Sequence, residues 1–201
     1  MILLYSDPLS PHCSRILCLL EQAGIPYEVA PIDLMKDEHL TPRYQAINPN
    51  RQVPTLDDEN VRIHESNAIL RYLCRKYGLE QWYPQDLPAL AKVEQWLDWN
   101  QCRLAPQMTT LVMNRMFLGD QADLAAADRA ETELHGLFSI LADGLRHTQC
   151  LAANHPTIAD LSVASNLALL AYANVKPDHP RIQDWYDRVI ALQGFHPPLA
   201  Q

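Results

Sequence analysis

MILLYSDPLSPHCSRILCLLEQAGIPYEVAPI, residues 1–32, changes its hydrophobic period twice and decides the fold. The apolar run at residues 2–5 has the length of a short strand, and Asp7-Pro8 ends it. Residues 11–23 place apolar side chains at helical spacing, and Gly24 and Pro26 stop that helix. Residues 27–32 alternate again, so the stretch predicts a strand, a helix and a second strand parallel to the first.

A predicted hairpin and helix complete the first half of the chain. Residues 53–56 and 61–63 are short apolar runs on either side of the polar residues 57–60, which predicts a β-hairpin. Ser66 can cap the following helix, which has its apolar side chains on one face and ends near Gly78. We therefore expect an α/β domain over residues 1–78.

The remainder of the chain has a helical pattern. Residues 79–87 have neither a helical nor a strand period and are predicted to be a linker. Helices are expected over residues 89–117, where Pro106 allows a kink, and over 121–147, 158–172 and 180–192. An antiparallel bundle buries their apolar faces most economically, so residues 88–201 are predicted to form an all-helical domain. Thr157 and Asp160 have the spacing of a capping box, which is a structural role.

Composition limits the classes of function. The chain has 201 residues, of which 48% are hydrophobic and 20% charged, as in a compact globular protein. A net charge of −8 argues against a nucleic-acid surface. No apolar run approaches the roughly 20 residues that span a bilayer, and the N-terminus lacks a secretory signal, so we expect no membrane partner and a cytoplasmic protein. Five scattered cysteines and eight histidines lack metal-ligand spacing, which predicts reduced thiols and no metal site.

Three motifs at separated places in the chain suggest a family. They are Leu4-Tyr5 followed by Ser10-Pro11-His12-Cys13, residues 48–56 (NPNRQVPTL) and residues 65–73 (ESNAILRYL). In this order they resemble the glutathione transferase superfamily, and residues 94–99 (EQWLDW) and 157–161 (TIADL) extend the resemblance through the helical half. The serine pattern is most similar to the theta and delta classes and their bacterial relatives. The implied fold is an α/β thioredoxin-like N-terminal domain followed by an all-α helical-bundle domain.

Ser10 is the expected catalytic residue. Conjugation needs the glutathione thiolate, because a thiol with a pKa near 8.5 is mostly protonated at neutral pH. A serine hydroxyl at the start of the first helix can stabilise the anion together with the helix dipole. An ordinary N-cap is the alternative role for Ser10. Cys13 is a rival nucleophile, although its place one turn into the helix favours a core position.

The resemblance also implies how the tripeptide is held. Val53-Pro54 corresponds to the family's cis-proline pair, in which Val53 binds the cysteinyl portion of glutathione. Glu65 and Ser66 match the residues that bind the γ-glutamyl ammonium and carboxylate, and a helix that starts at Ser66 suits an anion.

The opposite end of the peptide is less completely matched. His39, Arg51 and Gln52 are the positions that the resemblance assigns to the glycyl carboxylate. Gln52 cannot form an ion pair, and Arg51 can equally be a solvated surface side chain. Arg15 is displaced by one position from the family's usual Cys-Arg sequence, which leaves its role open.

A pocket for the electrophile is expected between the domains. Its candidate lining is a helical stripe of apolar residues, which can equally be plain core: Trp99, Leu104, Met108, Val112 and Met116.

The predicted function is a glutathione transferase that conjugates glutathione to small apolar electrophiles. Glutathione is a co-substrate, no cofactor is bound permanently, and relatives are homodimers that serve in detoxification. Glutathione-dependent isomerisation, dehalogenation or peroxide reduction would use the same thiolate. A non-catalytic adaptor with this architecture is the third alternative.

Overall fold

The computed structural model describes residues 1–196, so the last five residues of the predicted second domain lie outside it. The first domain contains a mixed four-stranded sheet in the order β2-β1-β3-β4. Strands β1 (Ile2–Ser6) and β2 (Tyr27–Pro31) are parallel, and β3 (Thr55–Asp58) is antiparallel both to β1 and to β4 (Val61–His64). The predicted strand-helix-strand unit and hairpin are confirmed, and the domain has the thioredoxin-like arrangement.

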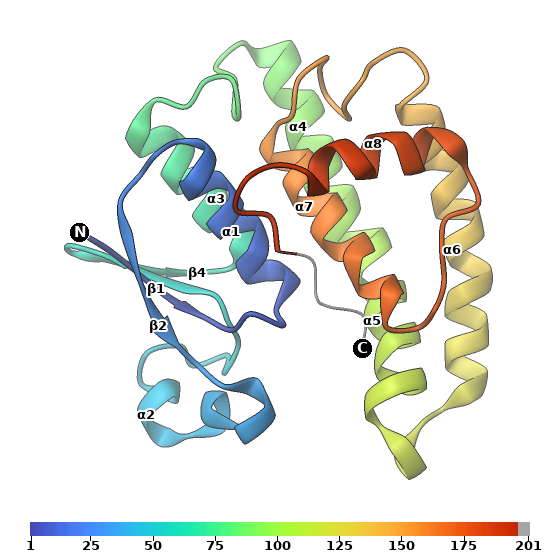
Figure 1. The fold of residues 1–201 in the computed structure, drawn as a ribbon, viewed down its shortest axis with the longest axis horizontal. Coiled ribbons are helices and arrows are strands. Elements are labelled where there is room, and N and C mark those ends of the chain that lie inside the picture. The colour runs from blue at the N-terminus through green and yellow to red at the C-terminus, as the bar shows by residue number, and fades with distance from the viewer. Residues whose placement is uncertain (197–201) are drawn as a thin grey trace.

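Helices α1 (Pro11–Gln22) and α3 (Ser66–Tyr77) lie between this sheet and the helical domain (Figure 1). Two single turns, η1 (Leu34–Lys36) and η2 (Glu38–Leu40), precede the short helix α2 (Pro42–Gln45). Ala23 is the C-cap residue of α1, and Gly78, which has a φ of 63°, is the C-cap residue of α3. Glycine fits there because this left-handed conformation is costly for residues with a Cβ. The predicted ends of both helices are confirmed.

The second domain consists of packed helices in the part of the chain that the structure describes (Figure 1). Its long elements are α4 (Leu87–Trp99), α5 (Ala105–Val112), α6 (Leu124–Gly144), α7 (Ile158–Leu167) and α8 (Pro180–Ile190). Shorter helical segments are η3 (Asn100–Leu104), η4 (Met113–Phe117), η5 (Gly119–Gln121) and η6 (Ala168–Ala171). Helices α4 to η4 form one continuous run from residue 87 to residue 117, close to the expected helix.

Pro106 does affect this run. Segment η3 is a π-helix in which the Ala105 N–H donates to the Asn100 carbonyl, five residues earlier. Because Pro106, in the first turn of α5, has no N–H and its ring crowds the preceding turn, the helix is widened directly before it. In this wide turn Gln101 lies beside residues of the first domain, whereas Asn100 donates to the Ser162 carbonyl of α7 at 3.0 Å, within the helical domain.

The two domains share one core and several polar contacts. Helix α1 packs on α7, and α3 packs on both. The Arg71 guanidinium on α3 contacts the Glu94 carboxylate on α4 at 2.9 and 2.6 Å, and the Tyr83 hydroxyl donates to the same carboxylate at 2.6 Å. The interface is therefore held by packing and by fixed hydrogen bonds, which sets the position of α1 and α3 against the helical domain.

The capping box at the start of α7 is confirmed. Asp160 accepts hydrogen bonds from the Thr157 N–H and hydroxyl, both at 2.8 Å. It also accepts from the Leu151 N–H and the Trp185 indole N–H, each at 2.8 Å. The side chain thus ties the loop before α7 and helix α8 to one buried point.

None of the described helices is long and apolar enough to cross a membrane. The five cysteines are free thiols, and of them only Cys102 is exposed. Over residues 1–196, no three His, Cys, Asp or Glu side chains are grouped so that they could hold a metal ion.

Candidate active site

A small polar cavity lies where the starts of α1 and α3 and the loop before β3 meet η3. Its volume is about 110 Å³. Four elements supply its walls: the first turn of α1, the loop before β3, the start of α3, and η3. The lining residues are His12, Asn48, Gln52, Val53, Pro54, Glu65, Ser66 and Gln101. Two sequence motifs that are far apart in the chain, residues 48–56 and 65–73, therefore meet at one site.

The loop before β3 is held rigidly by buried side chains. Asn48, which is 1% exposed, donates to the Gln52 carbonyl at 2.8 Å and to the Thr55 hydroxyl at 3.1 Å. The Tyr44 hydroxyl donates to the same Gln52 carbonyl at 2.8 Å. These contacts leave Val53 at the cavity wall, where its N–H and C=O have no hydrogen-bond partner among residues 1–196. An unpaired peptide group beside a cavity suits the backbone of a bound peptide.

The predicted Val53-Pro54 pair is joined by a cis peptide bond. This is the geometry expected at this place in a thioredoxin-like fold.

Helix α3 begins without a side-chain cap. Glu65 is the residue before the helix and has a φ of 70°, a left-handed conformation that is uncommon for a residue with a Cβ. Ser66 is the first helical residue, so the predicted start of the helix at Ser66 is confirmed, whereas the prediction that Ser66 caps it is wrong because Glu65 holds the N-cap position. The helix thus starts at the cavity wall with no side chain bonded to its first N–H groups, and an uncapped helix start of this kind attracts anions. Strained backbone is often found at binding sites.

Arg15 adds a positive charge directly behind this helix start. It is 0% exposed, and it forms no ion pair with any described residue. Its guanidinium instead donates to neutral side chains at 2.7–3.3 Å: Ser66, Asn67, Ser162, Ser165 and Asn166. Burial lowers the pKa of Arg15 to about 9. A buried cation without a counter-charge is costly, and a ligand carboxylate at Ser66 would offset that cost.

Ser10 lies at the start of α1, as predicted. It is the N-cap residue, and its Oγ accepts a hydrogen bond from the Cys13 N–H at 3.4 Å. A hydroxyl oxygen that accepts this bond still has its own proton to donate. Ser10 is 6% exposed and is not among the residues that line the cavity. Ser10 therefore acts as the N-cap of α1. This role is compatible with donation of its hydroxyl proton to a ligand.

Cys13 is in the core, as its helical position indicated. It is 0% exposed and packs with Tyr44 and Val53. Burial raises the pKa of the Cys13 thiol. A buried thiol with a raised pKa is a poor nucleophile, so the placement favours Ser10 over its rival.

Comparisons with known proteins agree with this architecture. Residues 4–81 match the family model described as "Glutathione S-transferase, N-terminal domain", and residues 124–188 match "Glutathione S-transferase, C-terminal domain". Glutathione S-transferase theta-3 of Mus musculus is 33% identical over 199 residues, which are 95% of this chain and 83% of the relative. The chain belongs to the glutathione S-transferase family. It is a transferase that uses glutathione, and its theta-like character agrees with the serine pattern.

Other relatives and solved structures give the same result. Glutathione S-transferase theta-1 of Homo sapiens is 33% identical and covers 95% of the chain, and glutathione S-transferase 3 of Zea mays is 30% identical and covers 98%; the matches span 83% and 92% of those relatives. The apo form of human glutathione-S-transferase T1-1 superposes with a TM-score of 0.88 at 29% identity, covering 96% of this chain and 84% of that one. Poplar glutathione transferase F1 has a TM-score of 0.88 at 28% identity, with coverages of 96% and 94%.

Most of the positions predicted to bind glutathione lie on the cavity wall, and two do not. Gln52, the cis pair and the Glu65-Ser66 pair line the cavity. Arg51 is exposed with a φ of 55°, and His39 lies in η2, so neither is on the wall of this transferase's cavity. The Nδ1 atom of His39 is buried and has no hydrogen-bond partner among the described residues. A buried polar atom without a hydrogen-bond partner is unusual in a folded protein and suggests a hydrogen bond to a bound molecule.

The predicted electrophile stripe is divided between core and surface. Leu104, Met108 and Val112 are at most 3% exposed and pack in the core or against it, whereas Met116 is 51% exposed. Trp99 is half-buried, with its ring edge-to-face against Trp96 at 5.0 Å between centroids. None of the five lines either described cavity. Helical periodicity identifies a stripe but does not say how much of it a neighbouring helix covers.

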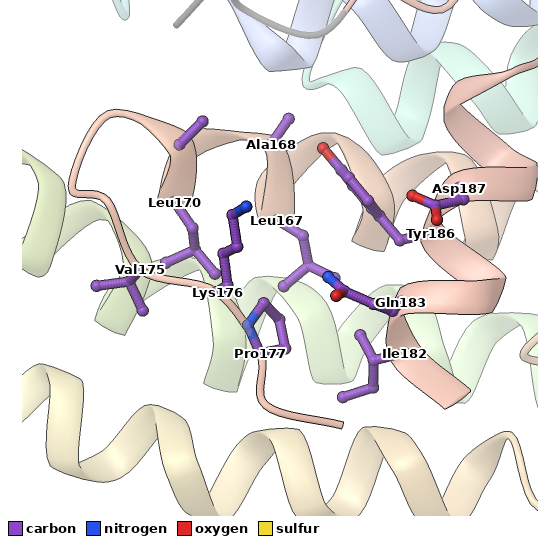
Figure 2. A pocket seen from close by; sticks show the side chains of 11 residues that line it. Leu167, Ala168, Leu170, Val175, Lys176, Pro177, Ile182, Gln183, Tyr186 and Asp187 are labelled. Carbon is purple, nitrogen blue, oxygen red and sulfur yellow. The ribbon is translucent and has the colours of Figure 1, made fainter. Parts of the chain in front are cut away.

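A second cavity, of about 210 Å³, lies within the helical domain (Figure 2). The end of α7, η6, the loop at residues 175–177 and α8 form its walls, and Leu167, Val175 and Ile182 make it largely apolar. It contains none of the residues predicted to bind the peptide or the electrophile.

Sequence reasoning missed His12, Asn48 and Gln101 as lining residues, and it left Arg15 without a role. His12 and Asn48 stand inside the quoted motifs, so their neighbours could have indicated them. Gln101 depends on the π-helical turn before Pro106, and Arg15 contacts residues up to 151 positions away, so no local pattern indicates either.

Proposed function

We propose that this cavity binds glutathione and that Ser10 stabilises its thiolate for attack on a small apolar electrophile. In this arrangement the γ-glutamyl carboxylate lies at the start of α3, on the Ser66 hydroxyl and N–H groups. The cysteinyl backbone pairs with Val53, and the glycyl end extends past Gln52 toward Arg51 and His39, whose unpaired Nδ1 supports a contact there.

The main support for the proposal is that the Ser66 hydroxyl lies at the uncapped start of α3 and also contacts the buried Arg15 guanidinium. The Ser66 Oγ accepts from the Arg15 guanidinium at 3.2 Å, and Arg15 forms no ion pair with an acid among residues 1–196. A carboxylate bound at Ser66 receives both the helix N–H groups and the field of the guanidinium. The free peptide groups of Val53 then fix the direction in which the rest of the ligand runs.

The chemical step follows from the position of Ser10 at the start of α1. Its hydroxyl proton can point at the sulfur while its oxygen remains bonded to the helix, and the helix dipole adds to the stabilisation. The thiol proton passes to solvent. The thiolate electron pair forms the new C–S bond, and a leaving group departs with its own electron pair when the electrophile carries one. A shift of one pKa unit requires about 1.4 kcal/mol of preferential stabilisation of the anion, which a hydroxyl and a helix end can supply.

The electrophile site is formed, in our proposal, by Met116, the exposed end of the predicted stripe, and by Phe117 beside it. Met116 and Phe117 are 51% and 52% exposed, and the Phe117 ring lies edge-to-face with Tyr172 at 5.8 Å. Polarisable and aromatic side chains of this kind accept varied apolar molecules. Trp99 remains part of the proposed lining, whereas Leu104, Met108 and Val112 are buried and take no part in it. A cytoplasmic homodimer that serves in detoxification remains our prediction.

Calorimetry and three activity assays test the proposal. We expect glutathione to bind with a measurable heat at millimolar ligand and a chlorinated aromatic to be conjugated. A haloalkane and a hydroperoxide separate dehalogenation and peroxide reduction from this reaction. The absence of any glutathione binding would refute the proposal and favour an adaptor.

A further inference from the structure

Two polar side chains of the cavity, His12 and Gln101, have no role in the proposed binding of glutathione described so far. His12 is the second residue of α1, and Gln101 comes from the π-helical turn of η3. Both line the same cavity as Glu65 and Ser66, and neither side chain forms a hydrogen bond with another residue between 1 and 196. They come from different domains, so their joint presence at one wall depends on how α1 and α4 are packed.

The surroundings of His12 fix its chemical form. The ring is half-buried and lies near the Arg15 guanidinium, and both effects oppose a second proton on the imidazole. Burial, with a smaller contribution from Arg15, lowers the pKa of His12 to about 3. A neutral imidazole has one ring nitrogen that accepts hydrogen bonds. The wall of this one cavity of about 110 Å³ therefore carries three acceptors, which are this nitrogen, the amide oxygen of Gln101 and the carboxylate of Glu65.

Three acceptors match an alkylammonium group, which has three N–H donors and no acceptor. Glutathione carries one such group, on the same carbon as the carboxylate that we assign to Ser66. Hydrogen-bond acceptors next to the carboxylate site at Ser66 can thus bind the ammonium while Ser66 binds the carboxylate, so both charged groups of the γ-glutamyl end are recognised.

We propose that His12 and Gln101 accept hydrogen bonds from the α-ammonium of the γ-glutamyl group, beside Glu65, and so select peptides with a free α-amino group. This inference rests on the proposed function, because it assumes that the γ-glutamyl carboxylate lies at Ser66. His12 and Gln101 act as binding residues here and take no part in the transfer step.

The test is calorimetry with two ligands. One is glutathione, and the other is glutaryl-cysteinyl-glycine, which lacks only the α-amino group. We expect His12→Phe to weaken glutathione binding by about tenfold, the usual effect of losing a hydrogen bond to a charged group. The Kd of the desamino peptide should change less than about twofold by the same reasoning, because it has no donor for the imidazole.

Two further variants keep the result interpretable. His12→Asn retains a polar acceptor and should recover most of the affinity for glutathione. Gln101→Met changes an exposed residue of the other domain, so it reports on the same ammonium even if His12→Phe fails to fold. It should also weaken glutathione and spare the desamino peptide.

Equal losses for both ligands in the two variants would overturn the inference, because they would indicate a structural effect. Unchanged affinity for both ligands would overturn it as well. If the unmodified protein binds neither peptide at millimolar concentration, the proposed function itself fails, and that outcome is distinct from the other two.

Discussion

Replacement of Asp160 by alanine tests how the helical domain is held together. The carboxylate is 0% exposed and accepts four hydrogen bonds, from the Leu151 N–H, the Trp185 indole N–H, and the N–H and hydroxyl of Thr157. Asp160→Ala leaves three buried N–H donors unpaired, since only the hydroxyl can rotate toward another acceptor. The capping box at the start of α7 is lost with them.

The size of the effect can be worked from these contacts. A buried donor left without a partner costs about 1–3 kcal/mol, so three donors at the lower end cost about 3–5 kcal/mol. Burial raises the pKa of Asp160, which indicates that the buried carboxylate itself costs stability. Its removal therefore offsets part of the loss caused by the unpaired donors. We therefore expect a loss of about 3 kcal/mol in the free energy of unfolding, and a fall in Tm of about 6–12 °C for a chain of this size.

Thermal unfolding followed by circular dichroism measures this directly, with glutathione affinity as a second readout. Asp184→Ala is the matched control, because Asp184 is an exposed aspartate of α8 and its loss should change stability by less than about 0.5 kcal/mol. Asp160→Asn keeps one acceptor oxygen and should have an intermediate Tm. The reasoning is refuted if Asp160→Ala melts within about 2 °C of the unmodified protein, which corresponds to less than about 1 kcal/mol.

Three other buried or exposed groups give further predictions. Arg15→Met should weaken glutathione binding at least about tenfold in calorimetry, because the carboxylate loses its counter-charge; an equal Kd would contradict this. The pKa of His12 is about 3 in the folded protein and has its ordinary value of 6.5 in the unfolded chain, so below pH 6.5 the unfolded chain binds the extra proton. The free energy of unfolding should therefore fall by up to about 1.4 kcal/mol per pH unit on acidification. Denaturant titrations at several pH values should show that the free energy of unfolding of His12→Asn depends less steeply on pH. A thiol reagent should label Cys102 alone in the native protein, and fast labelling of a second thiol would contradict the burial of the other four.

Local residues explain why the first domain could be predicted well. Gly24 and Gly78 end helices, and Pro11 starts one, through backbone preferences that do not depend on distant residues. The polar turn before Val61 fixes the hairpin in the same way. Strand and helix boundaries consequently fall within one or two residues of the expected ones.

The parts that were missed depend on tertiary packing. Leu104 and Met108 have the same helical spacing as an exposed stripe, and only the neighbouring helices decide that they are core. Ser66 begins α3 instead of capping it, because Glu65 adopts the left-handed conformation before the helix. Arg15 is paired across the domain interface with Ser165, 150 residues away, which a sequence pattern cannot indicate.

The central claim is that the Ser10 hydroxyl at the start of α1 stabilises the glutathione thiolate. The most direct test is a pH titration of the ultraviolet absorbance of the bound thiolate in the unmodified protein and in Ser10→Ala. We expect the substitution to raise the pKa of the bound thiol by about one to two units, which corresponds to about 1.4–2.7 kcal/mol, with little change in Kd. Identical titration curves for the two proteins would contradict the claim.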